Sequence, residues 1–121
     1  MKTLTDQKVQ GFGNEITVID EPGHGGACHE YLITGFDPPR GQRVLAAINF
    51  QNGPVKEFGI NGCQIEDLLA VNIHRLECFQ AGPFSNPKNQ EALEHCRSAL
   101  KALQHRTLER LSRGVEGRSK E

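Results

Sequence analysis

Three arginines near the carboxyl end of the chain have the type and spacing to bind phosphate. Arg106, Arg110 and Arg113 are separated by four and then three residues, which places side chains on one side of a helix. The planar guanidinium group holds phosphate oxygens in a fork geometry. Segment 97–113 contains two further basic residues and a single acidic one, although such a charge run is also typical of an ordinary solvated helix face.

A glycine-rich segment in the N-terminal half is the second candidate site. Glu21–Glu30 includes Gly23, Gly25 and Gly26, and glycines this dense let the backbone approach a ligand and present N–H groups to it. A long hairpin loop explains the same composition. The segment matches neither the P-loop nor the dinucleotide-binding glycine pattern. The segment is similar to an esterase oxyanion loop, but the sequence has no accompanying nucleophile motif.

Neither a metal nor another cofactor is expected. The four cysteines form no C-x-x-C pair and are predicted to be free thiols in a reducing compartment. Cys28 lies close in sequence to His24 and His29, yet three candidates within six residues do not match the ligand spacing of a tetrahedral zinc site.

The three arginines lie on the second of two predicted helices. The first carries apolar residues at intervals of three and four up to Phe79 and ends at Gly82. The second has Asn86 as its capping residue, Pro87 at its first position and Gly114 as its stop. Because the connector is short, we expect the helices to be antiparallel neighbours.

The apolar stripe of the second helix changes character near its end. Its spacing of three and four residues through 93–103 continues to Thr107 and Arg110, whereas the apolar residues in this part of the helix are Leu108 and Leu111. Either the helix extends beyond its partner and the arginine is solvated, or these polar groups line an interface or a ligand pocket made with another chain.

The segment before the helices is predicted to be β-rich, so the expected class is α+β: a small N-terminal antiparallel sheet followed by a two-helix antiparallel hairpin. Strands are predicted at Ile16–Asp20, Tyr31–Gly35, Val44–Gln51 and around Val55–Ile60. The predicted organisation is an N-terminal lead (1–14), the β-rich module with its glycine-rich loop (15–62), the hairpin (63–114) and a disordered tail (115–121).

Composition indicates a small protein with a thin core. A chain of 121 residues with 13 glycines, no tryptophan and one tyrosine buries little surface alone, so oligomerisation is expected. No apolar run approaches the roughly 20 residues of a membrane span, and residues 1–10 are too polar for a signal peptide. We therefore expect a soluble intracellular protein. Within a net charge of −1, residues 1–85 are acidic and residues 86–121 basic.

Several short motifs together resemble a known group of phage proteins. The chain resembles the helical hairpin of phage cyclic-nucleotide sponges, the anti-defence proteins that counter bacterial Thoeris and CBASS immunity, at FQAGPF (79–84), Asn89, Ala92-Leu93, RTLER (106–110) and RGVEG (113–117). The upstream segment DEPGHGGACHEY (20–31) resembles the N-terminal β part of the Thoeris anti-defence protein 1 family, which the shorter anti-CBASS sponge lacks. The resemblance spans about residues 15–117.

The resemblance implies sequestration of a signalling nucleotide in the cytoplasm of the infected bacterium, with no catalytic residue. Thoeris sensors make a cyclic ADP-ribose isomer as an alarm signal, and proteins of this family keep it from its effector. The expected ligand is the 1''-3' glyco-cyclic isomer. By spacing, the binding residues fall on Phe79, which would stack on the base, on Asn89, which would hydrogen-bond it, and on Arg106 and Arg110, which would hold the pyrophosphate.

The resemblance also implies a larger assembly and a second site. Three dimers would form a hexamer, in which Thr107, Arg110 and Arg113 near the threefold contacts would bind cyclic trinucleotides. Gly25 and Gly26 are expected to come near the first pocket.

The spacing along the second helix requires two chains for one pocket. Asn89 and Arg106 are 17 residues apart, which is about 25 Å along a helix and farther than a nucleotide-sized ligand reaches. If both bind the same ligand, Asn89 of one chain must meet Arg106 of another. A twofold dimer with two identical pockets is the expected result.

Simpler roles and other function classes stay open. The simpler roles are core packing for Phe79, helix capping for Asn89, and ion pairs of Arg106 and Arg110 with Glu109 or Glu66. An enzyme that degrades the same signal would need an acid–base pair or a metal, and His24, His29 and His105 lack an evident carboxylate or cysteine constellation. A nucleic-acid-binding hairpin suits the basic half-helix, but the near-neutral isoelectric point argues against it.

Overall fold

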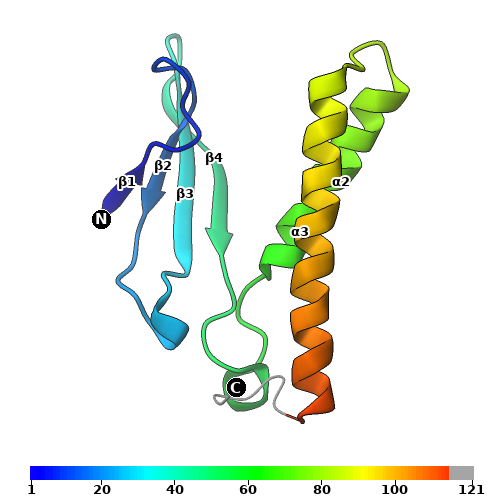
Figure 1. The fold of residues 1–121 in the computed structure, drawn as a ribbon. Helices are drawn as coiled ribbons and strands as arrows, with labels where there is room; N and C mark the ends of the chain where they lie inside the picture. The colour runs from blue at the N-terminus through cyan, green and yellow to red at the C-terminus, as the bar shows by residue number, and fades with distance from the viewer. Residues whose placement is uncertain (115–121) are drawn as a thin grey trace. The chain divides into compact units, whose positions relative to one another are not determined.

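The chain folds as two compact units in a computed structural model that describes residues 1–114 (Figure 1). The units are Met1–Cys63 and Gln64–Glu121. The first contains a four-stranded antiparallel sheet and the second contains two long helices, which confirms the predicted α+β class. The predicted disordered tail, residues 115–121, lies outside the described residues. Among the helices of residues 1–114, none is both long and apolar enough to cross a bilayer.

The sheet is an antiparallel meander with the strand order β1-β2-β3-β4 (Figure 1). Its strands are β1 (Lys2–Leu4), β2 (Glu15–Val18), β3 (Glu30–Asp37) and β4 (Gly41–Asn49). The last three overlap three of the predicted strands. By contrast, β1 lies in the segment predicted as a lead, because three residues are too few to show a strand pattern. Only its pairing with β2, in which Thr3 lies opposite Thr17, reveals it.

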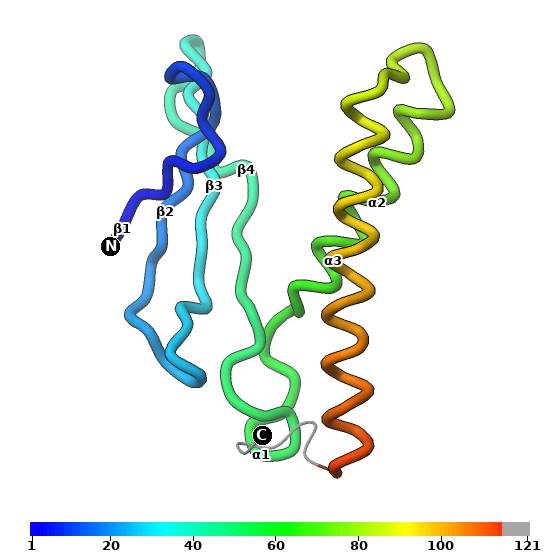
Figure 2. The backbone as a smooth tube through the Cα atoms, in the orientation of Figure 1, coloured from blue at the N-terminus to red at the C-terminus, as the bar shows by residue number. Residues whose placement is uncertain are grey.

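The strand predicted around Val55–Ile60 is wrong, because the structure has a one-turn helix there, α1 (Val55–Phe58; Figure 2). Apolar residues three apart suit a helical turn as well as a strand. Gly59 ends α1 at a φ of +74°, a conformation that glycine adopts readily. The Gln51 side-chain amide then closes the loop by donating to the carbonyl oxygens of Gly53 (3.0 Å) and Gly59 (2.7 Å).

The second unit is the predicted antiparallel hairpin of α2 (Ile65–Ala81) and α3 (Pro87–Ser112), as Figure 1 shows. The predicted cap of α3 is confirmed, since Asn86 Oδ1 accepts a hydrogen bond from Asn89 N at 2.9 Å. Gly114 follows the helix at a φ of +71°, in agreement with its predicted role as the stop. Strong local end signals therefore set both ends of α3.

The hairpin has a thin core centred on Leu93, whose surface is only 3% exposed. No residue of α2 is fully buried. Val71, Leu108 and Leu111 are 65%, 63% and 59% exposed, respectively. A single hairpin thus leaves apolar surface open, as the composition indicated.

Replacing Leu93 with alanine is expected to lower the free energy of unfolding by about 3 kcal/mol, because it removes buried apolar surface and leaves a cavity. Urea-induced unfolding measures this loss. The matched control is Glu94→Ala at the neighbouring exposed position, for which a change below about 0.5 kcal/mol is expected. Equal losses in the two variants would contradict the assignment of Leu93 as the centre of the core.

Candidate ligand-binding site

One end of the hairpin, here called the connector end, is formed by Phe79, Phe84 and Asn89 and carries aromatic and amide groups. Phe79 is half-buried near the end of α2, and Arg75 Cζ lies 5.0 Å from its ring centroid, a distance typical of a cation–π contact. Asn89 Nδ2 donates to the carbonyl oxygen of Phe84 at 3.4 Å. Because Asn86 caps α3, the Asn89 side chain is not needed for capping.

The opposite end, here called the arginine end, is formed by Arg106, Thr107 and Arg110. Arg106 Nη2 lies 3.9 Å from Oε2 of Glu66, which lies in the first turn of α2. The ion pair with Glu66 considered for Arg106 is therefore present. It is loose, and 45% of the Arg106 side chain is exposed.

At the arginine end, polar residues continue the face of α3 that carries the apolar stripe. Thr107 and Arg110 are half-buried, whereas Leu108 and Leu111 are mostly exposed. The structure agrees with part of each interpretation: α3 has 26 residues and α2 has 17, so α3 extends beyond its partner, while Arg110 is half-buried. A threonine and an arginine occupy positions where the rhythm of the core would place apolar residues.

The two ends of the hairpin lie far apart on one chain. Asn89 lies in the first turn of α3 and Arg106 about 25 Å farther along the axis. Phe79 lies at the same end as Asn89, because α2 ends where α3 begins (Figure 1). One chain therefore brings Phe79 and Asn89 to one end and Arg106 and Arg110 to the other. A role of these four residues in binding stays a prediction.

The glycine-rich loop belongs to the first unit and forms a short 3₁₀ turn, η1 (His24–Gly26). Gly25 and Gly26 have φ values of +74° and +77°, so the backbone itself favours glycine there. A Cβ atom on either residue would meet nothing within 4 Å. Both glycines therefore border open space, and their contact with a ligand stays a prediction.

Asp20 fixes the base of this loop, a role that the sequence analysis missed. Its carboxylate accepts hydrogen bonds from the backbone N–H groups of His29 (2.9 Å) and Glu30 (3.0 Å). Burial tends to raise the pKa of the Asp20 carboxyl, but the N–H groups of Glu30 and His29 outweigh it and hold the pKa below its ordinary value. An aspartate just before a Pro-Gly turn was the available signal.

Replacing Asp20 with asparagine is expected to destabilise the protein clearly near pH 6 and by a smaller margin below pH 3. Since the folded state lowers the pKa of Asp20, its contribution is complete above the unfolded pKa of about 3.9 and is lost as the pH falls through the folded pKa. Urea unfolding at both pH values tests this, with Asp6→Asn in the exposed β1–β2 loop as the control. A pH-independent loss would contradict it.

The residues considered for zinc have structural contacts in the loop. Cys28 Sγ donates to the Asp20 carbonyl oxygen at 3.4 Å, the His24 ring meets the edge or face of Phe58 at 5.1 Å between centroids, and His29 is buried. Across residues 1–114, no group of three His, Cys, Asp or Glu side chains could hold a metal ion.

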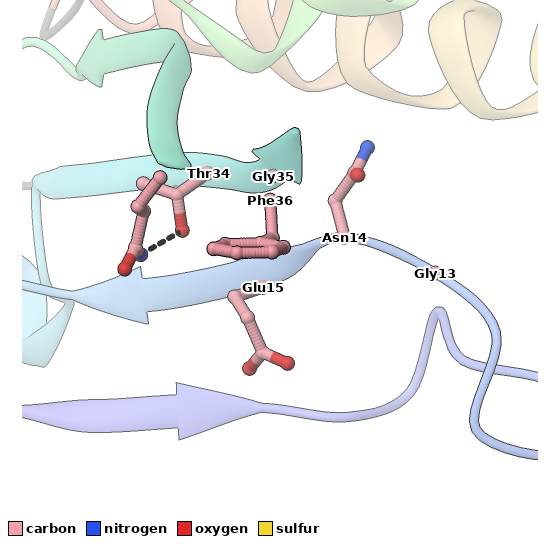
Figure 3. Close-up of a pocket in the computed structure, with 7 residues that line it drawn as sticks. Gly13, Asn14, Glu15, Thr34, Gly35 and Phe36 are labelled. Carbon is pink, nitrogen blue, oxygen red and sulfur yellow. Dashed lines mark hydrogen bonds between the residues drawn. The ribbon is translucent and has the colours of Figure 1, made fainter. Parts of the chain in front are cut away.

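A separate pocket of about 350 Å³ lies at one end of the sheet in the first unit (Figure 3). It is lined by Gly13, Asn14, Glu15, Thr34, Gly35, Phe36 and Gln42. Figure 3 shows the Phe36 ring beside a hydrogen bond of 3.1 Å from Gln42 Nε2 to Thr34 Oγ1. Since none of these lining residues is a lysine or an arginine, the pocket lacks the positive charge that a pyrophosphate requires.

A sequence comparison identifies the hairpin. The family model described as "Acb2/Tad1, hairpin domain" matches residues 42–107. The chain belongs to this family. The part that matches the Acb2/Tad1 model contains Phe79, Asn89 and Arg106, and it ends before Arg110 and Arg113.

A relative supports the Acb2/Tad1 assignment over a longer region. The chain is 49% identical over 95 residues to a protein named Thoeris anti-defense 1 from Bacillus phage SBSphiJ7. The aligned region covers 78% of this chain and 63% of the relative, so the chain spans less than two thirds of the relative's length. The family resemblance drawn from the short motifs is thereby confirmed.

Proposed function

We propose that this protein is a phage anti-defence sponge that binds the Thoeris signal and withholds it from its effector without cleaving it. The observation that carries the proposal is the division of the hairpin into an aromatic and amide end and an arginine end. These are the two kinds of group that a nucleotide with a pyrophosphate needs. The relative, a phage protein named Thoeris anti-defense 1, supports an anti-defence role, and the cytoplasm of the infected bacterium is the proposed location.

The proposed pocket lies between two chains. Two α3 helices that run antiparallel would bring the connector end of one chain to the arginine end of the other, and the twofold axis would create two identical pockets. In each, Phe79 stacks on the base and Asn89 bonds its edge, while Arg106 and Arg110 of the second chain hold the pyrophosphate. The thin hairpin core and the exposed leucines of α3 support this assembly.

The proposed ligand is the 1''-3' glyco-cyclic isomer of ADP-ribose, and its sequestration uses noncovalent contacts alone. Gly25 and Gly26 are proposed as further contacts of the ligand. High affinity with slow release would be sufficient for immune evasion, so the proposal requires no turnover.

A second ligand class, the cyclic trinucleotides of CBASS, is proposed for an assembly of three dimers. Thr107, Arg110 and Arg113 would bind it near the threefold contacts. The observation that favours this site is the half-burial of Thr107 and Arg110. These residues place a hydroxyl and a guanidinium at positions of α3 where the spacing of the apolar stripe would place core residues.

The test of the proposed function is calorimetric titration of the full chain with cyclic ADP-ribose isomers, followed by heating of the complex and analysis of the released compound. Tight binding near one ligand per chain, with intact ligand recovered, is the expected result. Recovery of a cleaved product would establish an enzyme. Binding of DNA that weakens steeply between two salt concentrations, without binding of any isomer, would establish a nucleic-acid-binding protein.

A further inference from the structure

We infer that Glu66 determines which sugar the arginine end accepts. Its outer carboxylate oxygen would accept a hydrogen bond from a free ribose hydroxyl beside the phosphate that Arg106 binds. The site would then prefer a pyrophosphate carried by unmodified ribose and reject one whose ribose is itself phosphorylated. This inference rests on the proposed function and adds a specificity residue to it.

The Glu66 carboxylate is partly buried at the start of α2. Glu66 lies in the first turn of α2, where the positive end of the helix dipole favours a carboxylate. Its Oε1 is shielded from solvent and has no hydrogen-bond partner within residues 1–114. The side chain is 23% exposed, so Oε2 is the oxygen that meets both solvent and Arg106.

The contact between Glu66 and Arg106 leaves hydrogen-bonding capacity on the pair. A second pair between the same helices, Arg97 Nη2 and Glu77 Oε2, forms a direct hydrogen bond of 2.7 Å. The corresponding separation of 3.9 Å between Arg106 and Glu66 gives charge attraction without a hydrogen bond. The Arg97–Glu77 pair is thus satisfied by itself, whereas Arg106 and Glu66 each keep hydrogen-bonding capacity that a third group could use.

That third group must accept from a guanidinium and donate to a carboxylate at neighbouring positions. A phosphate with an adjacent sugar hydroxyl does both, because its oxygens accept and the hydroxyl donates. Carboxylates recognise ribose hydroxyls in the same way in dinucleotide-binding proteins. The chemistry of the pair therefore fits a phosphate together with a ring hydroxyl of the ribose that carries it.

The negative charge of Glu66 would disfavour a ligand whose ribose is phosphorylated. The phosphoryl group would replace the donor hydroxyl with further negative charge, and this charge would repel the neighbouring Glu66 carboxylate strongly in a partly buried site. Specificity built on a required hydroxyl is commonly large, because the protein group is left unpaired when the hydroxyl is missing. We expect a preference of about 100-fold for the unmodified ribose.

The experiment compares the wild type, Glu66→Gln and the matched control Glu77→Gln by calorimetry with two probes: the cyclic ADP-ribose isomer and its 2'-phosphorylated counterpart. Glu66→Gln keeps the shape of the side chain and removes its charge. The substitution is expected to weaken binding of the unmodified isomer about 10-fold. It is also expected to reduce the preference for the unmodified isomer over the phosphorylated probe by at least about 30-fold. Glu77→Gln should leave both affinities within about 2-fold.

A change of both affinities by the same factor would overturn the inference, because a merely structural role of Glu66 would act on both probes alike. An unchanged preference would overturn it as well. A wild type that binds neither probe would instead refute the proposed function itself, so the two failures are distinguishable. Urea unfolding of each variant shows whether the fold is kept.

Discussion

Replacing Arg106 with alanine is expected to weaken binding of the cyclic ADP-ribose isomer by about 1,000-fold. The guanidinium would make charge-assisted hydrogen bonds to the pyrophosphate, and removal of one partner from such a buried contact commonly costs several kcal/mol. The fold should persist, because the ion pair with Glu66 is loose and its arginine is half exposed, and pairs of this kind contribute at most about 1 kcal/mol. Calorimetry measures the loss of affinity.

Arg97→Ala is the matched control for that experiment. Arg97 lies on the same helix and also pairs with a glutamate of α2, but in the middle of the hairpin. Its removal should change the affinity by less than about 3-fold. Comparable losses in both variants would mean that α3 attracts the ligand by its overall charge and that no defined arginine pocket exists.

The sequence predicted the hairpin well, because its ends carry strong local signals. Asn86 and Pro87 begin α3, and Gly114 follows its end, as their chemistry requires. The strand predicted around Val55–Ile60 failed for the opposite reason, since a four-residue apolar segment does not distinguish a turn of helix from a strand. Local chemistry was sufficient where it was unambiguous.

The parts of the site that depend on tertiary contacts were harder to predict. Asp20 contacts backbone groups nine and ten residues later, and no periodic pattern links them. The half-burial of Arg110 could be suspected from the rhythm of α3, but the sequence left a solvated arginine equally open. Glu66 was considered only as an ion-pair partner, because its shielded, unpartnered oxygen is visible only in the structure.

Complementation between two inactive variants is the second large effect expected. Asn89→Ala and Arg106→Ala should each fail to bind when expressed alone. A heterodimer of the two would contain one pocket with Asn89 from the Arg106→Ala chain and Arg106 from the Asn89→Ala chain, and therefore one intact site per two chains. Co-expression with two different tags, purification through both, and calorimetry would measure this stoichiometry.

The control uses the same two substitutions in the opposite arrangement. A chain that carries both Asn89→Ala and Arg106→Ala, paired with a wild-type chain, would have one damaged residue in each interchain pocket, and it should bind no ligand tightly. If each pocket were formed within a single chain, the outcomes would be reversed: this heterodimer would keep one site, and the complementing pair would have none. The separation of about 25 Å between the two residues along one helix favours the first outcome.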